Sequence, residues 1–566
     1  MAEILLSPGV LSREIDASFI AEQPPQIGAA IIGPTVKGPV GIPVTVTSYT
    51  DYVNRFGETE VIPNSGSYSY FTSIAAYNYF QNGGQTLLVT RVVSGTYSPA
   101  SSSITNIATN PAFSLVTISE GAMQNSFSTP TSTGALPSGS ANNIRWEIVS
   151  SKTSSGTFNL YIRRGDDDNK NKAILETYTG LSMDPLDDNY VARRIGDYQF
   201  TQENIDGEDT LQITGTYPNK SRYVRIGQVF TPTPQYFLGG VPNPSYINLI
   251  PANGSGSFNG GTGASSTTAK FYDQIESTNI QGLQAANYTS SINLLKSAND
   301  FQFNTLIIPG LNYADHDTEL DTIITNTQER GDNILVIDLG NYSSSASEVI
   351  NTAASIDSSY VAAYYPWVQT LDPATNQYVF VPASTMIPGV YAFNDRVAEP
   401  WFAPAGINRG GLSSVIRAAS KLSQGIRDDL YVGKVNPIST FPGQGVVVYG
   451  QKTLQTKASA LDRINVRRLM IALKRTIGQI ANTIVFQPNN ASTRNSFLAN
   501  VNPYLESVQQ RQGLFAFKVV MDEAINNPSV IDRNELVGQI YLQPTKTAEF
   551  IYLNFTLTPT GATFPA

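Results

Sequence analysis

Predicted helices and short apolar strands alternate along two separate parts of the chain, and this alternation limits the fold more than any other feature. In the second part, the sequence predicts helices at 290–296, 318–330 and 346–355, and strands at 305–308, 334–339 and 361–365. Strands that alternate with helices are typical of a mostly parallel sheet with helices on its faces. We therefore expect an α/β core made of a mixed sheet with covering helices.

The first part of the chain has the same character between residues 23 and 94. Strands are predicted at 27–32, 44–46 and 86–93, and helices at 48–56 and 69–81. Ser48 has the chemistry to cap the first helix, and Asn82-Gly83-Gly84 is a typical left-handed stop after the second, which is predicted to be amphipathic. Residues 23–94 and 285–430 are accordingly predicted to form one core, interrupted by the residues between them.

The composition changes at Ser94, after which Ser, Thr, Asn, Gly and Pro become frequent. The predicted strands of this part lie at 113–118, 144–150, 157–163 and 223–229. Together these features indicate a β-rich surface insertion over residues 95–284. Within it, the Gly- and Ser-rich stretch at 251–268 is predicted to be a flexible loop.

Both ends of the chain are predicted to be extended arms. Residues 1–22 contain two short extended stretches around Pro8-Gly9, and residues 545–566 contain a strand-like segment at 549–557. Between the core and the second arm, residues 431–544 are predicted to form a C-terminal domain with a strand at 446–449 and a long helix after 462. The backbone groups of a lone strand need partners, which come either from the same chain or from another sheet.

Few side chains offer the chemistry of a catalytic or metal site. The 566 residues include one His and no Cys, which excludes disulfides and thiolate ligands. His316 is interpreted as part of a polar loop before a helix. The run Asp166-Asp167-Asp168-Asn169 resembles a fragment of a calcium loop, but Lys170 occupies a ligand position, so a solvated turn is predicted. We expect no cofactor.

Charge and hydropathy narrow the classes of partner. The net charge of −9 disfavours direct binding to nucleic acid, whereas residues 440–566 carry 12 Lys and Arg against 7 Asp and Glu and should face an acidic partner. No apolar run approaches the ~20 residues that cross a membrane, so no membrane insertion is expected. The first residues lack the pattern of a signal peptide, which predicts assembly in the cytoplasm.

Several short motifs occur in one shared order near the two ends of the chain. The C-terminal motifs are Asn436-Pro437-Ile438, residues 441–450, Ile464-Asn465-Val466-Arg467-Arg468-Leu469, residues 485–489 and Val501-Asn502-Pro503-Tyr504. The N-terminal motifs are Ser7-Pro8-Gly9-Val10, Ile32-Gly33-Pro34-Thr35, residues 37–40, Arg55-Phe56-Gly57 and residues 80–84. In these motifs and their order, the sequence resembles the tail sheath family of contractile bacteriophages, which is related to the sheaths of contractile injection systems and tailocins.

The resemblance implies a structural subunit and not an enzyme. Copies of the chain would form stacked hexameric rings around a tail tube, and contraction would drive the tube through the target envelope during genome delivery. The implied partners are further copies of the chain, the tail tube protein, and the baseplate and tail terminator proteins. The implied location is the virion, after assembly in the host cytoplasm. The alternative is the sheath of a bacterial injection system or a tailocin.

The resemblance also implies roles for particular residues. The expected strand donors to neighbouring subunits are Leu5, Leu6, Val10, Leu11, Ile15, Phe550, Ile551, Tyr552, Leu553 and Phe555. The expected acceptor is a sheet that contains Val446, Val447, Val448 and Tyr449, with the segment 515–521 as a second candidate. The cations expected to face the tube are Lys457, Arg463, Arg467 and Lys474.

The sequence disfavours two other classes of protein. An α/β hydrolase is disfavoured because the chain has one His, no Cys and no nucleophile elbow. A secreted β-rich adhesin is disfavoured by the absence of a signal-peptide pattern.

Overall fold

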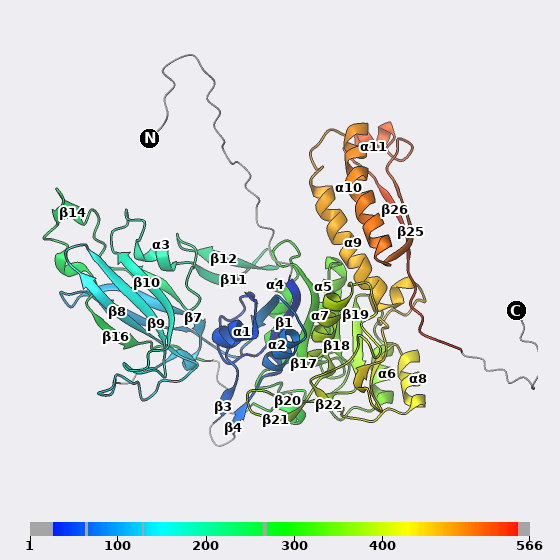
Figure 1. Ribbon diagram of the computed structural model, residues 1–566, viewed down its shortest axis with the longest axis horizontal. Coiled ribbons are helices and arrows are strands. Elements are labelled where there is room, and N and C mark those ends of the chain that lie inside the picture. Colours follow the sequence, from blue (N-terminus) through cyan, green and yellow to red (C-terminus); the bar gives the residue numbers. More distant parts are fainter. Residues whose placement is uncertain (1–26, 63–65, 127–128, 264–268, 553–566) are drawn as a thin grey trace, which may run out of the picture.

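The computed structural model describes residues 27–62, 66–126, 129–263 and 269–552. Three parts are visible in Figure 1: a β-rich part at the left, an α/β core in the centre, and a helical C-terminal part at the upper right. Helix α9 (Ile464–Asn482) rises from the core into the C-terminal part. The predicted combination of mixed sheets and helices is therefore present.

The core contains one eight-stranded sheet with the order β2-β5-β1-β17-β18-β19-β23-β24. Its strands are β1 (Ile27–Gly33), β2 (Val44–Val46), β5 (Leu87–Arg91), β17 (Phe303–Asn312), β18 (Ile334–Asp338), β19 (Val361–Tyr365), β23 (Asn436–Phe441) and β24 (Gly445–Val448). The six inner strands run parallel, and the two edge strands are antiparallel to their neighbours. β1 pairs with both β5 and β17, so the two parts of the chain share one sheet, as predicted.

Alternate residues of the strands supply two apolar layers. Ala29 and Ile31 belong to one buried cluster, whereas Ala30 and Ile32 belong to another on the opposite face. The first cluster includes side chains of α1 (Tyr49–Phe56), α2 (Phe71–Gln81) and α7 (Ile387–Val397). The second includes side chains of α4 (Thr289–Leu294), α5 (Asp317–Arg330), α6 (Ala346–Ala354) and α8 (Gln424–Val432).

The first two helices test the predicted start and stop signals. Ser48 caps α1 by accepting a hydrogen bond from the Asp51 backbone, and α2 ends before Gly83, whose φ is +94°. The prediction that α2 is amphipathic is wrong, because it is buried on nearly all sides. Its Asn78 is satisfied inside the protein, where the amide donates to the Met386 carbonyl oxygen and accepts from the Ser414 hydroxyl.

The β-rich part leaves the core after β5 and returns before β17. A four-stranded sheet (β10-β9-β8-β16) and a three-stranded sheet (β13-β7-β6) share one apolar cluster that includes Phe113, Phe158 and Phe258. The strands are β6 (Pro99–Thr105), β7 (Pro111–Glu120), β8 (Ile144–Lys152), β9 (Thr157–Arg164), β10 (Ile174–Ser182), β13 (Val224–Val229) and β16 (Gly254–Ser257). The hairpin of β11 (Gln199–Ile205) and β12 (Glu208–Thr214) contacts the core, where Gln202 donates to the Ser290 carbonyl oxygen at 2.9 Å.

The described part of the Gly-rich stretch is ordered structure and not the flexible loop that we predicted. β16 pairs with β8, and Asn259 exchanges two backbone hydrogen bonds with Ser101. A Cβ on Gly256 would lie 2.6 Å from the ring of Trp146, so glycine here permits close packing. Residues 264–268 lie outside the described residues.

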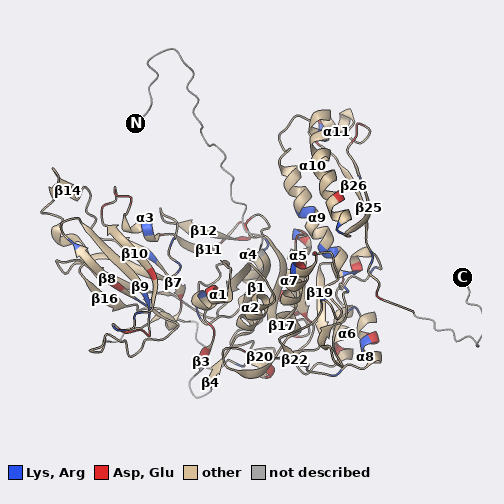
Figure 2. Cartoon of the chain, viewed as in Figure 1, with Lys and Arg blue, Asp and Glu red and all other residues tan. Residues whose placement is uncertain are grey.

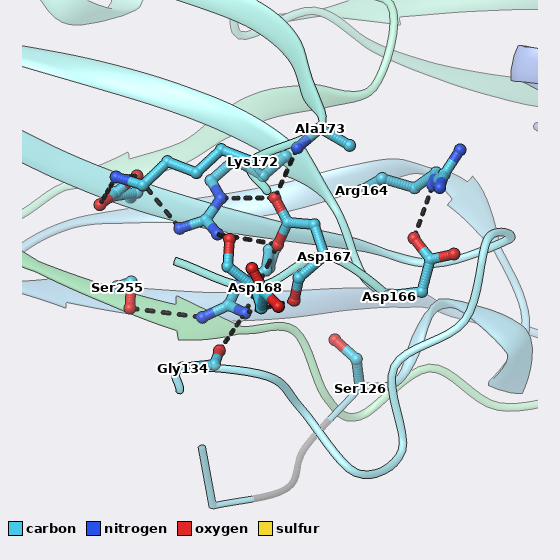
Figure 3. A network of polar contacts seen from close by, with 12 residues as sticks. Ser126, Gly134, Arg164, Asp166, Asp167, Asp168, Lys172, Ala173 and Ser255 are labelled. Atoms are coloured by element: carbon cyan, nitrogen blue, oxygen red, sulfur yellow. Dashed lines mark hydrogen bonds and ion pairs between the residues drawn. The ribbon is translucent and has the colours of Figure 1, made fainter. Parts of the chain in front are cut away.

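The acidic run after β9 is also more buried than the predicted solvated turn. Asp167 accepts hydrogen bonds from Arg163 Nε at 2.7 Å and from the Ala173 backbone N–H at 2.9 Å (Figure 3). Arg163 and the neighbouring Arg145 are fully buried, and Glu147 completes the ion network at 3.1 Å from Arg163. Asp166, Asn169 and Lys170 are exposed and Asp168 is half-buried, as expected of a turn.

The C-terminal part packs two long helices against a small sheet. Helix α9 and helix α10 (Ala491–Gln510) enclose Leu469, Leu473, Phe497 and Val501. The sheet consists of β25 (Leu514–Val520) and β26 (Gln539–Pro544), and the short helix α11 (Pro528–Asp532) lies between these strands in the sequence.

Candidate assembly surfaces

The sheet formed by β25 and β26 has two strands and two outer edges. The strands are antiparallel, with Lys518 opposite Tyr541 and Val519 opposite Ile540. Among the residues that the structure describes, neither strand pairs with a third. Phe515 and Tyr541 are 76% and 57% exposed. An open edge with exposed aromatic residues is a template for pairing with another strand.

The inner face of this sheet explains why so small a sheet is held in place. Leu514 is buried, and Phe517, Ile540 and Leu542 pack against the cluster of α9 and α10. An isolated two-stranded sheet is marginally stable, so this packing supplies its support. The inner face of the sheet is therefore covered, although its two outer edges are unpaired among the described residues.

The segment after β26 is attached to the core through Glu549. Its carboxylate accepts hydrogen bonds from Arg463 Nε at 2.8 Å, from Gln451 Nε2 at 2.9 Å and from the Tyr431 hydroxyl. Burial opposes ionisation of this carboxyl group, but the hydrogen bonds from Arg463, Tyr431 and Gln451 outweigh burial and lower the pKa of Glu549 below its ordinary value. We call Glu549 and these three partners the arm anchor.

The residues that follow the arm anchor are exposed. Phe550, Ile551 and Tyr552 are 68%, 76% and 87% exposed, and residues 545–552 form no strand. Three of the predicted strand donors therefore lie on the surface, and their pairing with another chain stays a prediction. The other predicted donors lie outside the described residues: Leu5, Leu6, Val10, Leu11, Ile15, Leu553 and Phe555.

The predicted acceptor strand has both of its edges in use within the chain. β24 pairs with β23 on one side. On the other side, the Leu412 backbone N–H donates to the Val446 carbonyl oxygen at 2.9 Å, and the Val448 N–H donates to the Gly410 carbonyl oxygen at 2.8 Å. An incoming strand would have to displace this segment, so Val446, Val447 and Val448 do not offer a vacant edge. Tyr449 is 48% exposed just beyond the strand.

The cations of α9 meet the amino ends of three neighbouring core strands. Arg475 donates to the carbonyl oxygens of Phe303 and Asp332 at 3.2 and 3.1 Å, at the starts of β17 and β18. Arg467 bonds to the Ser359 hydroxyl and lies 3.9 Å from the ring centroid of Tyr360, just before β19. Figure 2 shows blue segments, which are Lys and Arg, on α9 where it approaches the core.

This arrangement corrects the predicted basic ridge. Arg467 is 5% exposed and Arg463 belongs to the arm anchor, so neither projects as a free surface cation. Lys457 and Lys474 are exposed, and Lys474 donates to the Tyr360 hydroxyl at 3.2 Å. A role of these two lysines toward a tube stays a prediction.

Two further observations bear on chemistry. His316 is buried, and its Nε2 lies 3.0 Å from the Ser277 carbonyl oxygen, so the residue joins α5 to a neighbouring loop. Over the described ranges, no three His, Asp or Glu side chains are grouped to hold a metal, and no helix is long and apolar enough to cross a membrane.

Sequence reasoning missed the arm anchor and the strand-like segment Gly410–Leu412. Tyr431, Gln451 and Glu549 are far apart in the sequence, and no local pattern brings them together. The segment that covers β24 contains two glycines and no β-branched residue, so it carries no strand signal.

Two family descriptions match adjacent parts of the chain. Residues 281–454 match the phage tail sheath protein central domain, and residues 456–558 match the phage tail sheath C-terminal domain. The first match covers the second part of the core, and the second covers α9, α10, β25 and β26.

Individual relatives are similar over about two fifths of the chain. The tail sheath protein of Vibrio phage KVP40 is 44% identical over 216 residues, which are 38% of this chain and 31% of that protein. The tail sheath protein of Enterobacteria phage T4 is 39% identical over 225 residues, which are 40% of this chain and 33% of that protein. The match thus spans about a third of the length of these relatives.

A solved structure extends the likeness of fold to nearly the whole chain. The helical sheath of the anti-feeding prophage in its contracted state aligns over 98% of this chain and 99% of that chain. The TM-score is 0.50 and the sequence identity is 16%.

Proposed function

We propose that the chain is the repeating structural subunit of a contractile tail sheath, because residues 281–454 and 456–558 match two domains of phage tail sheath proteins and the two relatives described above are tail sheath proteins. Copies form stacked hexameric rings around a tail tube. A trigger from the baseplate lets the rings contract, and the tube is driven through the target envelope during genome delivery. The subunit acts mechanically and resides in the virion after assembly in the host cytoplasm.

The observation that carries this proposal is the open sheet of β25 and β26 beside an exposed terminal segment. Strand addition needs an acceptor with free backbone groups and a donor without a partner. The unpaired outer edges of β25 and β26 and the exposure of Phe550, Ile551 and Tyr552 support the proposal. We assign the acceptor to β25 and β26 and not to β24, whose outer edge is occupied. The donors are residues 549–557 and the N-terminal arm, 1–22, of neighbouring copies.

Strand exchange allows large movement without loss of contact between subunits. Main-chain hydrogen bonds tether each copy, while rigid cores exchange one packing for another. The arm anchor fixes where the C-terminal arm leaves its own core. The proposed hinges are residues 17–25, which lie outside the described residues, and residues 545–547. Residues 542–544, which we had also expected to act as a hinge, belong to the paired strand β26.

The C-terminal domain, 431–544, faces the tube in this proposal. Lys457 and Lys474 are its exposed candidates for contact with an acidic tube surface, through weak and salt-sensitive pairs. The baseplate and the tail terminator bind the two ends of the sheath. The identities to two phage tail sheath proteins, 44% and 39% over about two fifths of the chain, favour a phage tail.

Negative-stain electron microscopy tests the proposal with three proteins: the intact chain, a chain without residues 1–22 and a chain without residues 549–566. We expect striated hollow cylinders from the intact chain, alone or with tail tubes, and short or no cylinders from both truncations. Cylinders of full length from both truncated chains would refute strand addition. Absence of cylinders from the intact chain in the presence of tubes would refute the sheath function.

A further inference from the structure

A pocket opens at the seam between the α/β core and the β-rich insertion. Its empty volume is about 430 Å³, which includes solvent at its mouth. Both parts of the chain contribute polar side chains to the wall: Lys37, Asn54, Arg55, Gln124, Asn142 and Arg222. Three of these side chains are cations and none is an acid.

Lys37 is the unusual member of this wall. It is 6% exposed, and within the described part of the chain its ammonium group has no hydrogen bond or ion pair. A buried charge without a partner is costly, and a nearby negative charge removes that cost. Burial, and secondarily the charge of Arg164, lower the pKa of Lys37 to about 8.

The backbone around Lys37 is held rigidly. The Lys37 N–H donates to the Phe56 carbonyl oxygen at 3.0 Å, and the Gly38 N–H donates to the Ser119 hydroxyl at 2.6 Å. Gly38 has φ of +116°, and a Cβ there would lie 2.5 Å from the ring of Phe56. The lysine is therefore presented to the pocket by a segment with little freedom to withdraw.

The other cations at the seam have carboxylate partners. Arg55 and Arg222 both contact Asp51, at 3.0 and 3.1 Å. Arg164 pairs with Asp166 at 2.5 Å, apart from the buried network of Asp167 (Figure 3).

Further acids near this seam also have partners, and Glu176 accepts a hydrogen bond from the Arg222 backbone N–H at 2.8 Å. Glu120 accepts from the Val40 N–H at 3.0 Å and interacts with Arg91 and Arg225. Lys37 is thus the cation that the seam leaves without a negative partner among the described residues.

We propose that this pocket binds a small inorganic oxyanion, of the phosphate or sulfate class, with Lys37 as its principal ligand. Arg55 and Arg222 share the wall and add charge-assisted donors, and the amides of Asn54 and Asn142 supply neutral ones. Because the wall comes from both parts, the bound anion ties the insertion to the core. The proposal is independent of the sheath function.

Calorimetric and thermal titrations of the full chain test the proposal. Sodium phosphate and sodium sulfate are each titrated at pH 7 and constant ionic strength, with sodium chloride as the ionic-strength control. We expect saturable binding and a saturable rise in melting temperature with phosphate or sulfate, and neither with chloride. Lys37→Met should weaken binding about tenfold or more, because a hydrogen bond to a charged group is lost.

The control variant is Lys220→Met, which removes an exposed lysine of the insertion and should leave anion binding unchanged. Lys37→Met removes a buried charge, so it should melt no lower than the parent without anion, and a lost response then reports binding and not misfolding. In buffers of different ionisation enthalpy at pH 8, phosphate binding should take up protons in the parent and not in Lys37→Met. Equal responses to chloride, or unchanged phosphate binding in Lys37→Met, would overturn the proposal.

Discussion

Many buried residues of this protein are charged or polar, and some of them have hydrogen-bond partners that can be named. Asp338 is such a residue. It lies at the end of β18, where it accepts hydrogen bonds from the backbone N–H and the hydroxyl of Ser384. Burial raises the pKa of Asp338 to about 7, although the two hydrogen bonds act in the opposite direction.

A pH-dependent stability follows from Asp338. Its pKa is raised in the folded state above the unfolded value of about 4, so the folded protein binds the additional proton between about pH 4 and pH 7. Across this window the Asp338 contribution falls as pH rises, by at most roughly 1.4 kcal/mol per pH unit. Asp338→Asn should therefore gain stability relative to the parent from pH 4 to 7 in denaturant melts. A difference between the two proteins that is constant with pH would contradict the assignment.

The two neighbouring aspartates of the insertion permit a matched test of burial. Asp167→Ala leaves Arg163 and Arg145 buried without their carboxylate and should cost about 3–5 kcal/mol. Asp166→Ala removes a partly exposed pair with Arg164 and should cost less than about 1 kcal/mol. Hydrogen exchange of peptides from β8 to β10 measures the loss of stability in each of the two variants. Similar protection in the two variants would show that the buried network does not stabilise the insertion.

At the scale of elements, α9 connects the C-terminal part to the core by polar contacts as well as by its apolar stripe. From Arg467 to Arg475 the helix rises about 12 Å. The starts of β19 and β17, which these residues contact, are two strand spacings apart, about 9.6 Å. The rise of the helix between Arg467 and Arg475 is thus close to the distance between the two strands that these residues contact.

Loss of Arg475 should loosen this attachment. Arg475→Met removes hydrogen bonds to Asn304 and to the carbonyl oxygens of Phe303 and Asp332, at a cost of roughly 1–3 kcal/mol. We expect faster hydrogen exchange in α9 and at the start of β17, and no change in β7. Lys457→Met is the control, because Lys457 is an exposed lysine with no such contacts. Equal hydrogen exchange in both variants would show that apolar packing alone attaches α9 to the core.

The absence of cysteine makes strand addition testable by disulfide capture. Tyr541→Cys and Tyr552→Cys place thiols on β26 and on the exposed terminal segment. In mixed polymers of the two single variants, mild oxidation should give dimers on a non-reducing gel. Tyr378 is 66% exposed on β21 (Gln377–Val381), in a separate three-stranded sheet, and Tyr378→Cys should not pair with Tyr552→Cys. For the double variant, efficient capture within dilute monomers would instead indicate that the segment folds back on its own chain.

The arm anchor should govern the same segment. Glu549→Gln removes the charge that holds Arg463, and the segment after it should become several-fold more sensitive to protease, for a loss on the order of 1 kcal/mol. Glu535→Gln alters an exposed pair with Arg533 and serves as the control. Equal cleavage of residues 545–552 in both variants would argue against the anchor.

For the whole molecule, the sequence predicted what depends on local pattern and missed what depends on distant contacts. The core strands and most helices carry hydrophobic runs, caps and glycine stops that act over a few residues, as at Ser48 and Gly83. The packing of Gly256 on Trp146, the burial of Asp167 and the cover on β24 each depend on residues distant in the sequence or on the course of the folded chain. Arg467 is a further example. Helical spacing predicts which face of α9 it lies on, but not that this face packs against Ser359 and Tyr360 of the core.

The position of the insertion determines the order in which parts of the chain can fold during synthesis. β1 needs β17 as its second neighbour, and about 210 residues separate the end of β5 from the start of β17. At roughly 5–20 residues per second, a ribosome takes about 10–40 s to bridge that interval. During this time one edge of β1 emerges without its mate, while the insertion can already close its own apolar cluster. The insertion can therefore fold before the core is complete. Cellular factors that bind exposed strand edges have tens of seconds in which to act.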